Sequence, residues 1–514
     1  MAQIIAGGTK PDSGGNVEVI TQTQTTTWTQ LQGKPYIAVS SKGIVNGLST
    51  IPNDGADFGP DTTLGATAPG QYGSPYTETS GIQESYSYAI SQLNKKIFIM
   101  NGNYTITTTV SISSDVSIEG EMIGKKDADA NFYGGTAVGV IVTVLTSGID
   151  AFLIQGTKTS GITVSMKNII VDYTQVTTAG YGFHTQTVSG ADSEVGSVYA
   201  SEFDNLYVLS NDPNVQGFYF GDFLYSRFGR LYSLNGGGFY FGNSANSTSF
   251  NPGNSVIDLL YWQMNDTAGN ISQIGIEFYG SVAINLMVVN YIQIINSANA
   301  STGATYETLI ELNNCNSTIF NVVDLENLSL ASSQDIMLFN AYGNRFNCIS
   351  SGVNGRLYNT GTGGAGNVVT IIPNASNWTL HDLSGGNIYY LSSGNTTLSA
   401  FSSASKVVYF GNIPTPTISA NPPVSGTAYQ NTNPYDIRLK IPVTYNPTST
   451  AAATLATGIS STSTVTTTTK VSIPAGLTAA DGQILTYDMV VPAGWYYELV
   501  ATNATIGTVE VQAA

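Results

Sequence analysis

The chain has little charge, almost no cysteine or histidine, and no long apolar run. Only 10% of its 514 residues are charged, and it contains two cysteines and two histidines. Ordinary globular proteins carry about 25% charged residues. No Cys/His cluster is present for a zinc site, and no run approaches the ~20 apolar residues that a membrane-spanning helix requires. The sequence therefore predicts no metal, no cofactor and no membrane span.

The few charges that are present are mostly acidic. Asp and Glu number 34 against 17 Lys and Arg, which gives a net charge of −17, and the basic residues form no cluster. Binding to a phosphate backbone requires a basic face. Nucleic acid is therefore not an expected partner. A surface with few ion pairs also predicts a stability that changes little with pH.

The two cysteines are Cys315 and Cys348. Cys348 is equivalent to Asn321 in the repeat described next, and Cys315 lies six residues before Asn321 along the chain. That offset is too large for a bridge between stacked neighbours. The spacing favours two small buried side chains over a disulfide.

What the sequence does contain is a short repeated pattern: an apolar residue, a spacer, a small or polar residue, then an aliphatic one. The third position of the pattern is occupied by Asn168, Asn205, Arg230, Asp258, Asn285, Asn321 and Cys348. Steps of 25 to 37 residues indicate one supersecondary unit per repeat, with insertions in the loops. Units this short cannot bury an apolar face alone, so neighbours must stack. The four asparagines predict a side-chain ladder at a tight bend.

The repeated units are strands rather than helices. They are rich in Ile, Val, Phe, Tyr and Thr, which suit a pleated, half-buried surface. Residues 217–222 and 238–243 are nearly identical and lie 21 residues apart, which is one turn of a solenoid. The best helical pattern runs from Ile82 to Leu93. The sequence predicts an all-β chain in which residues 51–411 form a parallel β-helix with a short N-terminal capping helix.

The motifs at the start of this region follow a recognisable order. An Asp-Gly turn at 53–57 is followed by the helix, by Gly102-Asn103-Tyr104 in a strand, and by Val116-Ser117-Ile118-Glu119-Gly120. This order resembles the beginning of pectate-lyase-like right-handed, single-stranded β-helices, as found in viral tailspikes and polysaccharide-active enzymes. The resemblance covers roughly residues 53–410. Gly-His-Gly, an Asp-Asp pair after Asn-Thr-Asp, and Arg-x-Lys are absent, so polygalacturonase chemistry is not implied.

The resemblance implies a tailspike or tail-fibre protein on a virion surface, outside the cell. The charge-poor, Tyr-, Thr- and Asn-rich composition is similar to that of thermostable proteins exposed to hot acid outside archaeal cells, which suggests a virus of an extremophilic archaeon. The implied partners are a host-envelope glycan or glycoprotein, two further copies of the chain in a homotrimer, and other tail proteins. No secretion leader is visible in residues 1–16, as expected for a protein assembled into virions.

The two ends of the chain differ from the solenoid. Residues 1–50 are Gly-rich and Thr/Gln-rich, with too little apolar content for a core of their own. They are interpreted as a virion-attachment segment, although a loose terminus or a capping strand explains them equally well. Residues 412–434 are Pro-rich and predict a linker. Residues 435–514 predict a small antiparallel β-sandwich.

Glycan cleavage requires two carboxylates, about 6.5–9.5 Å apart in inverting enzymes. Residues i and i+2 on one face of a strand lie about 6.6 Å apart. Two pairs fit this spacing, Glu202 with Asp204 and Asp324 with Glu326. They are the candidate catalytic residues of an inverting glycoside hydrolase or lyase, although carboxylates on a solvated face are the simpler interpretation.

Glycan binding without cleavage needs only aromatic faces for sugar rings and fixed polar groups for hydroxyls. The candidate residues are Tyr219, Asp222, Tyr240, Asn243, Tyr261, Trp262, Trp495 and Tyr496. Half of the solenoid group, and the Trp495-Tyr496 pair, can equally be core residues. The leading hypothesis is a virion-surface adhesin that binds host-envelope glycans or glycoproteins. The alternatives are a polysaccharide-degrading enzyme and a cell-surface adhesin without virion attachment.

Overall fold

The structure, a computed structural model, divides into two compact units, residues 1–265 and 266–514. It describes residues 35–43, 56–93, 95–121, 139–157, 160–176, 180–187, 197–210, 215–234, 236–244, 251–263, 269–295, 304–326, 332–339, 341–350, 354–359, 364–373, 377–392, 396–402, 404–409, 416, 418–433, 436–446, 452–474, 483–492 and 494–513.

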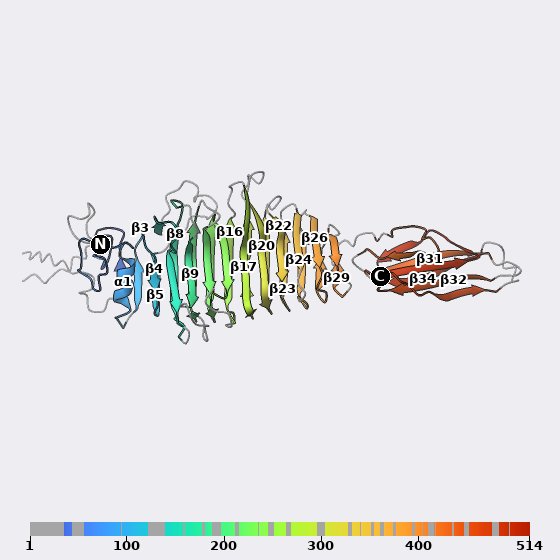
Figure 1. Cartoon of the computed structure of the whole chain (residues 1–514), viewed down its shortest axis with the longest axis horizontal. Helices are drawn as coiled ribbons and strands as arrows, with labels where there is room; N and C mark the ends of the chain where they lie inside the picture. The colour runs from blue at the N-terminus through green and yellow to red at the C-terminus, as the bar shows by residue number, and fades with distance from the viewer. Residues whose placement is uncertain are drawn as a thin grey trace, which may run out of the picture. The chain divides into compact units, whose positions relative to one another are not determined.

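The described residues of the first unit form mainly two parallel sheets of a β-helix (Figure 1). The first, called here the β11 sheet, has the order β1 (Ile37–Val39), β2 (Lys96–Ile99), β5 (Val116–Gly120), β8 (Val164–Asp172), β11 (Glu202–Leu209), β14 (Arg227–Leu234) and β16 (Val256–Gln263). The second, the β12 sheet, has the order β4 (Val110–Ile112), β7 (Phe152–Gly156), β9 (Tyr181–Thr187), β12 (Gln216–Gly221) and β15 (Gly237–Gly242). To the side of the β11 sheet's main path, β3 (Gly102–Ile106) pairs with β6 (Val140–Val144), which pairs with β8. A separate two-stranded sheet is formed by β10 (Val198–Tyr199) and β13 (Phe223–Leu224).

Residues 266–514 contain the same parallel pattern and, at the C-terminal end, two antiparallel sheets. One parallel sheet contains β18 (Val288–Val289), β19 (Ile292–Ile295), β21 (Ile319–Glu326), β23 (Arg345–Ser350), β25 (Val368–Pro373), β27 (Ile388–Leu391) and β29 (Lys406–Tyr409). The other contains β17 (Gly269–Asn285), β20 (Ala304–Asn316), β22 (Ser332–Phe339), β24 (Asn354–Asn359), β26 (Asn377–Asp382) and β28 (Thr396–Phe401).

The antiparallel sheets form the predicted sandwich. One sheet has the order β30 (Ala428–Gln430), β35 (Tyr496–Thr502), β32 (Ala453–Ser460) and β33 (Thr468–Ile473). In the other, β31 (Ile437–Tyr445) pairs with β34 (Gln483–Val491), β36 (Ala504–Ile506) and β37 (Glu510–Ala513). The predicted fold class, a parallel β-helix followed by an antiparallel β-sandwich, is confirmed.

Stacked aromatic side chains fill the interior of the first unit. Phe203 and Phe228 are fully buried on consecutive strands of the β11 sheet, with ring centroids 5.6 Å apart and nearly parallel planes. Phe183, Phe218 and Phe239 stack in the same way along the β12 sheet. Each strand alternates these buried residues with side chains that face outward. The functional side chains discussed below therefore lie on the outer faces.

The capping helix and the Gly-x-Tyr motif occur where the sequence predicts them. Helix α1 (Ile82–Ala89) buries Ile82 and Tyr86, but it ends before Leu93. Gly102 has a φ of 154°, and a Cβ atom there would lie 1.9 Å from the Ser41 hydroxyl oxygen, so no other residue fits. The fully buried Tyr104 donates its hydroxyl hydrogen to the carbonyls of Val39 (3.1 Å) and Met100 (2.6 Å).

The repeat identifies the strands but places two of them one residue out of register. The repeat aligns Phe228 with Val256, but in the structure Phe228 pairs with Ile257. It aligns Phe346 with Ile319, but Phe346 pairs with Phe320. Both predictions are wrong because each site has two adjacent apolar residues, and the pattern cannot decide which of them faces inward. The repeat also places residues 283–286, around Asn285, in the same sheet as β21 and β23. Residues 283–285 lie instead in β17, in the other parallel sheet, where Ile284 pairs with Cys315.

The predicted asparagine ladder is present between Asn168 and Asn205, both in the left-handed conformation, with φ of 60° and 55°. The Asn205 side-chain amide donates to Oδ1 of Asn168 over 2.7 Å. A second ladder was not predicted. In it, the backbone N–H of each residue just before a strand donates to the side chain of the equivalent residue one turn later. Its members are Thr318, Asn344, Asn367, Asn387 and Ser405.

Two strands lie within segments that the sequence assigns to the N-terminal region and the linker. Residues 37–39 form β1, which pairs with β2, so the sheet begins inside the predicted N-terminal segment. β30 pairs with β35, so the sandwich takes up residues from the predicted linker. Residues 1–34 lie outside the described residues. Cys315 and Cys348 are both buried and free, as expected. Among the described helices, none has the length and apolar character needed to cross a membrane.

Candidate functional site

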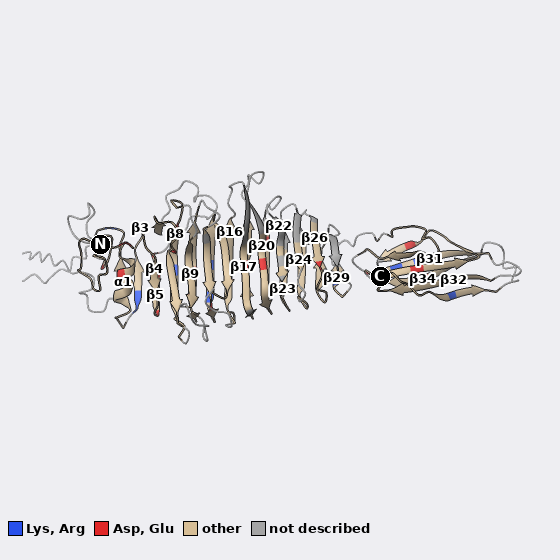
Figure 2. Ribbon diagram, in the orientation of Figure 1, with Lys and Arg blue, Asp and Glu red and all other residues tan. Residues whose placement is uncertain are grey.

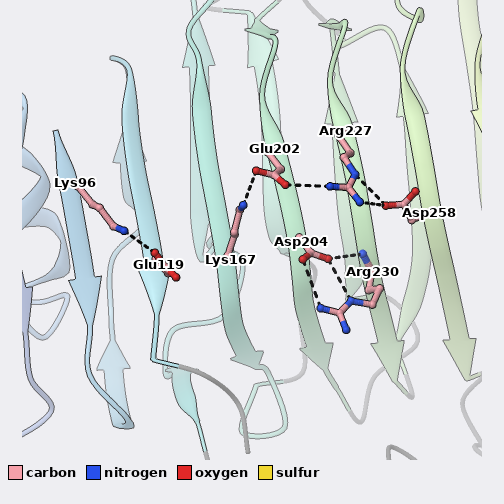
Figure 3. A network of polar contacts seen from close by, with 8 residues as sticks. All are labelled: Lys96, Glu119, Lys167, Glu202, Asp204, Arg227, Arg230 and Asp258. Carbon is pink, nitrogen blue, oxygen red and sulfur yellow. Dashed lines mark hydrogen bonds and ion pairs between the residues drawn. The ribbon is translucent and has the colours of Figure 1, made fainter. Parts of the chain in front are cut away.

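The first candidate catalytic pair belongs to a ladder of ion pairs across the outer face of the β11 sheet (Figure 3). A Glu202 carboxylate oxygen lies 2.5 Å from the Lys167 ammonium nitrogen, and the other oxygen lies 3.4 Å from the Arg227 guanidinium. Arg227 also contacts Asp258 over 2.7 Å. Charged side chains are sparse elsewhere on the described strands (Figure 2). Exposed pairs of this kind typically contribute about 0–1 kcal/mol each.

Asp204, the partner of Glu202 in the predicted pair, accepts hydrogen bonds from Arg230. Its Oδ1 lies 3.0 Å from the Arg230 backbone nitrogen and 3.3 Å from the Arg230 Nε. Burial alone would raise the pKa of Asp204, but these hydrogen bonds and the charges of Arg230 and Arg227 outweigh it and lower the pKa. A general acid in glycoside hydrolysis needs a raised pKa. The environment of Asp204 is therefore opposite to that of a general acid.

The second candidate pair lies on β21. Asp324 is partly buried, and its Oδ2 accepts a hydrogen bond from the Tyr291 hydroxyl over 2.9 Å. Glu326 is the last residue of the same strand and pairs in register with Ile295. Its side chain lies outside the described residues, so the proposed pairing of the two carboxylates stays a prediction.

A row of rings runs along the outer face of the β12 sheet and contains two of the predicted glycan-binding residues. Tyr219 and Tyr240 stack with centroids 4.2 Å apart and planes 8° apart. His184 contacts Tyr219 edge-on at 4.7 Å, and Tyr181 packs against both. We call Tyr181, His184, Tyr219 and Tyr240 the ring row. All four are partly exposed. The sequence indicated the two stacked tyrosines but not the histidine beside them.

A partly buried carboxylate orients the histidine of the ring row. Nδ1 of His184 lies 2.7 Å from Oδ2 of Asp150, and the other oxygen of Asp150 accepts the backbone N–H of Tyr181 over 3.0 Å. This contact engages Nδ1 and leaves Nε2 as the ring nitrogen that Asp150 does not use. Because the stacked rings cover one another's faces, the row offers mainly ring edges together with this nitrogen.

Four other predicted binding residues are buried in the first unit. Asp222 is fully buried and accepts hydrogen bonds from Thr187 and Ser244. Asn243 is 3% exposed, and its carbonyl accepts the hydroxyls of Tyr219 (3.3 Å) and Tyr240 (2.6 Å).

The adjacent residues Tyr261 and Trp262 are likewise buried. Tyr261 is 8% exposed, and Trp262 is fully buried, with its indole N–H donated to the Gly236 carbonyl over 3.1 Å. Asn243 thus supports the ring row through its carbonyl, whereas Asp222 and Trp262 are part of the interior.

Trp495 and Tyr496 lie in the C-terminal sandwich. Trp495 is partly buried and packs against the sandwich core, which includes Tyr497. Tyr496 is the first residue of β35, also partly buried, and pairs with Gln430 and Ser460. The pair therefore lies in a different domain of the fold from the ring row.

A carboxylate pair that the sequence analysis did not single out lies on β17 and β20. Glu277 and Glu311 are register partners on adjacent strands, each between buried apolar residues. Burial, and secondarily the charge of Glu311, raise the pKa of Glu277 from 4.5 to about 7. The sequence does contain a sign of this pairing, since the segments Gly275-Ile276-Glu277-Phe278 and Leu309-Ile310-Glu311-Leu312 align residue for residue.

Among the described residues, no group of three His, Cys, Asp or Glu side chains is arranged to hold a metal ion. Comparison with protein-family models and with curated proteins gives no match.

Solved structures similar to this chain include three phage tailspikes. They are the enzymatically active domain of tailspike protein 4 of bacteriophage CBA120 (12% identity, 93% of this chain and 72% of that chain, TM-score 0.22), tailspike protein 3 of the same phage (13%, 68% and 63%, 0.17) and the tailspike protein of Acinetobacter baumannii phage AM24 (11%, 83% and 69%, 0.20). Identity and TM-score are low in every case, so these likenesses carry no argument about the function of this chain.

Proposed function

We propose that the chain is a virion-surface tailspike or tail-fibre adhesin that binds host-envelope glycans or glycoproteins. The observation that carries the proposal is the ring row, a line of partly exposed aromatic side chains on a rigid, charge-poor sheet face, with an oriented histidine among them. Aromatic rings with a few fixed polar groups are the usual chemistry of sugar recognition. A parallel β-helix supports such a row because each strand repeats the position of the last.

The proposal includes attachment and assembly. Residues 1–34 would attach the protein to other tail proteins, and three copies would form a homotrimer. The low charge content supports a virion that meets hot acid, as around an extremophilic archaeon. A deletion that tests attachment must stop at residue 34, because removing β1 would expose the buried Ile97 and Ile99 of β2. The attachment proposal fails if protein lacking residues 1–34 still joins particles.

Replacing Tyr219 and Tyr240 by alanine is expected to weaken glycan binding by roughly tenfold, because it removes the two stacked tyrosine rings, half of the ring row. Binding is measured on a printed array of microbial surface glycans and then by titration calorimetry with the best-binding oligosaccharide.

Tyr207→Ala/Tyr232→Ala is the matched control. These two tyrosines stack with the same 4.2 Å separation on the β11 sheet, away from the ring row. The control should keep wild-type affinity. Equal losses in both double variants would attribute the effect to the fold rather than to the ring row.

A polysaccharide-degrading enzyme is the second candidate, and the raised pKa of Glu277 beside Glu311 favours it. A carboxyl group that stays protonated near neutral pH can donate a proton to a glycosidic oxygen, and a neighbouring carboxylate can act as the base or nucleophile. If this is correct, incubation with the glycans bound on the array releases oligosaccharides detectable by mass spectrometry, and Glu277→Gln abolishes the release while binding persists. Unchanged release in Glu277→Gln would exclude Glu277 as the acid.

A further inference from the structure

Two tyrosines outside the ring row lie exposed at the corner where β10 and β13 form the small third sheet. Tyr199 ends β10 and is 43% exposed, and Tyr225 directly follows β13 and is 56% exposed. Their ring centroids are 5.5 Å apart and their planes meet at 79°. An edge-to-face pair leaves ring faces open, whereas the stacked tyrosines of the ring row cover each other. This corner therefore offers more exposed aromatic surface than the partly exposed ring row.

The backbone conformation at position 225 is unfavourable for a tyrosine, so the residue does not contribute to stability through its backbone. Its φ is 50°, in the left-handed region that disfavours bulky side chains. The same position on the neighbouring strands is filled by Ala200 (φ 49°) and Asn254 (φ 48°). Asparagine tolerates this conformation well, so the turn itself does not require a tyrosine. With more than half of its surface exposed, the Tyr225 side chain also recovers little by burial. Strain of this kind concentrates at binding sites.

The charged and polar groups around Tyr199 and Tyr225 indicate which type of ligand the pair could bind. Asp222 is the one charged residue within the corner segments 160–163, 197–201, 222–226 and 251–256, and it is buried. Asp115 reaches the corner from outside these segments and accepts the backbone N–H of Thr163 over 2.9 Å.

The corner segments present hydroxyl and amide groups, including the exposed Thr163 and Asn254. A neutral sugar ring has an apolar C–H face for an aromatic ring and hydroxyls for such groups. Arg227, which directly follows the corner segment 222–226, is already paired with Glu202 and Asp258, and Asp115 adds a negative charge, so the corner does not favour an acidic sugar.

We propose that Tyr199 and Tyr225 form a second carbohydrate subsite, which stacks a neutral sugar ring. The proposal rests on the glycan-binding function proposed above but uses a different surface from the ring row. It names the class of sugar residue that the adhesin must contact, a neutral one, in at least one position of the bound glycan.

The test uses Tyr225→Asn and Tyr199→Ala in the full chain, on the same glycan array and in titration with the best-binding neutral oligosaccharide. Tyr225→Asn is expected to weaken binding roughly five- to tenfold while the Tm stays unchanged or rises, because asparagine relieves the left-handed strain. A tyrosine kept for structure would show the reverse, a lowered Tm with intact binding. Tyr199→Ala should show the same loss of binding.

Three results would overturn the subsite. Wild-type affinity in both variants would do so while leaving the adhesin intact if Tyr219→Ala/Tyr240→Ala still loses binding. A change in sedimentation coefficient with intact binding would assign the pair to a contact between copies of the chain. If wild-type protein binds no glycan on the array, the adhesin proposal itself fails.

Discussion

Replacing Asn367 by alanine is expected to lower the free energy of unfolding by about 3–5 kcal/mol. Asn367 is fully buried, and its side chain makes hydrogen bonds in two directions. Its Oδ1 accepts the backbone N–H of Asn344 over 3.0 Å, and its Nδ2 donates to the carbonyls of Ala341 (2.8 Å) and Gly364 (3.1 Å). Alanine removes all of these partners at once and leaves buried polar groups without hydrogen bonds, each of which costs about 1–3 kcal/mol.

Urea unfolding followed by tyrosine and tryptophan fluorescence measures the effect, and Asn347→Ala is the control. Asn347 also belongs to a strand of the solenoid, but its amide makes one exposed hydrogen bond, to the Asn321 carbonyl over 3.1 Å. Its replacement should change the free energy of unfolding by less than about 0.5 kcal/mol. If the two variants lose similar free energies of unfolding, the buried hydrogen bonds of Asn367 do not stabilise the fold as predicted.

Much of the fold could be predicted from the sequence because a solenoid repeats its local pattern. The near-identical segments around Tyr219 and Tyr240 were placed one turn apart, and the structure pairs them residue for residue. Prediction failed where the pattern was degenerate. Val256 and Ile257 are both apolar, and only packing shows that Ile257 is fully buried while Val256 is 38% exposed. The ladder through Asn367 was missed because its members precede the strands, outside the repeat that was followed.

The candidate site was less predictable for a related reason. An aromatic residue in a strand packs equally well inward or outward, so Tyr219 and Trp262 looked alike in sequence, although Trp262 is fully buried. Glu277 and Glu311 lie 34 positions apart in the sequence, and their adjacency depends on the register of β17 and β20. Register is a property of long-range pairing and cannot be read from one strand.

The stability of the chain is expected to fall between pH 5 and pH 8 because of Glu277. Burial and the neighbouring Glu311 raise the pKa of Glu277 from 4.5 to about 7, so the folded state holds a proton that the unfolded state has released. The free energy of unfolding therefore decreases as pH rises from about 4.5 through about 7, by up to about 3 kcal/mol. The low charge content alone predicted little pH dependence, and this pair is a physical reason to expect more.

Glu277→Gln should remove most of that pH dependence, because a neutral amide replaces the group that must ionise beside Glu311. The measurement is the urea midpoint of each protein at pH 5 and pH 8, and the two histidines cancel in the difference because both proteins contain them. Glu202→Gln is the matched control. Glu202 faces outward on the β11 sheet between Lys167 and Arg227, so its removal should leave the fall between pH 5 and pH 8 unchanged. A Glu277→Gln protein that still loses stability as steeply as wild type would show that ionisation of Glu277 does not limit the fold at neutral pH.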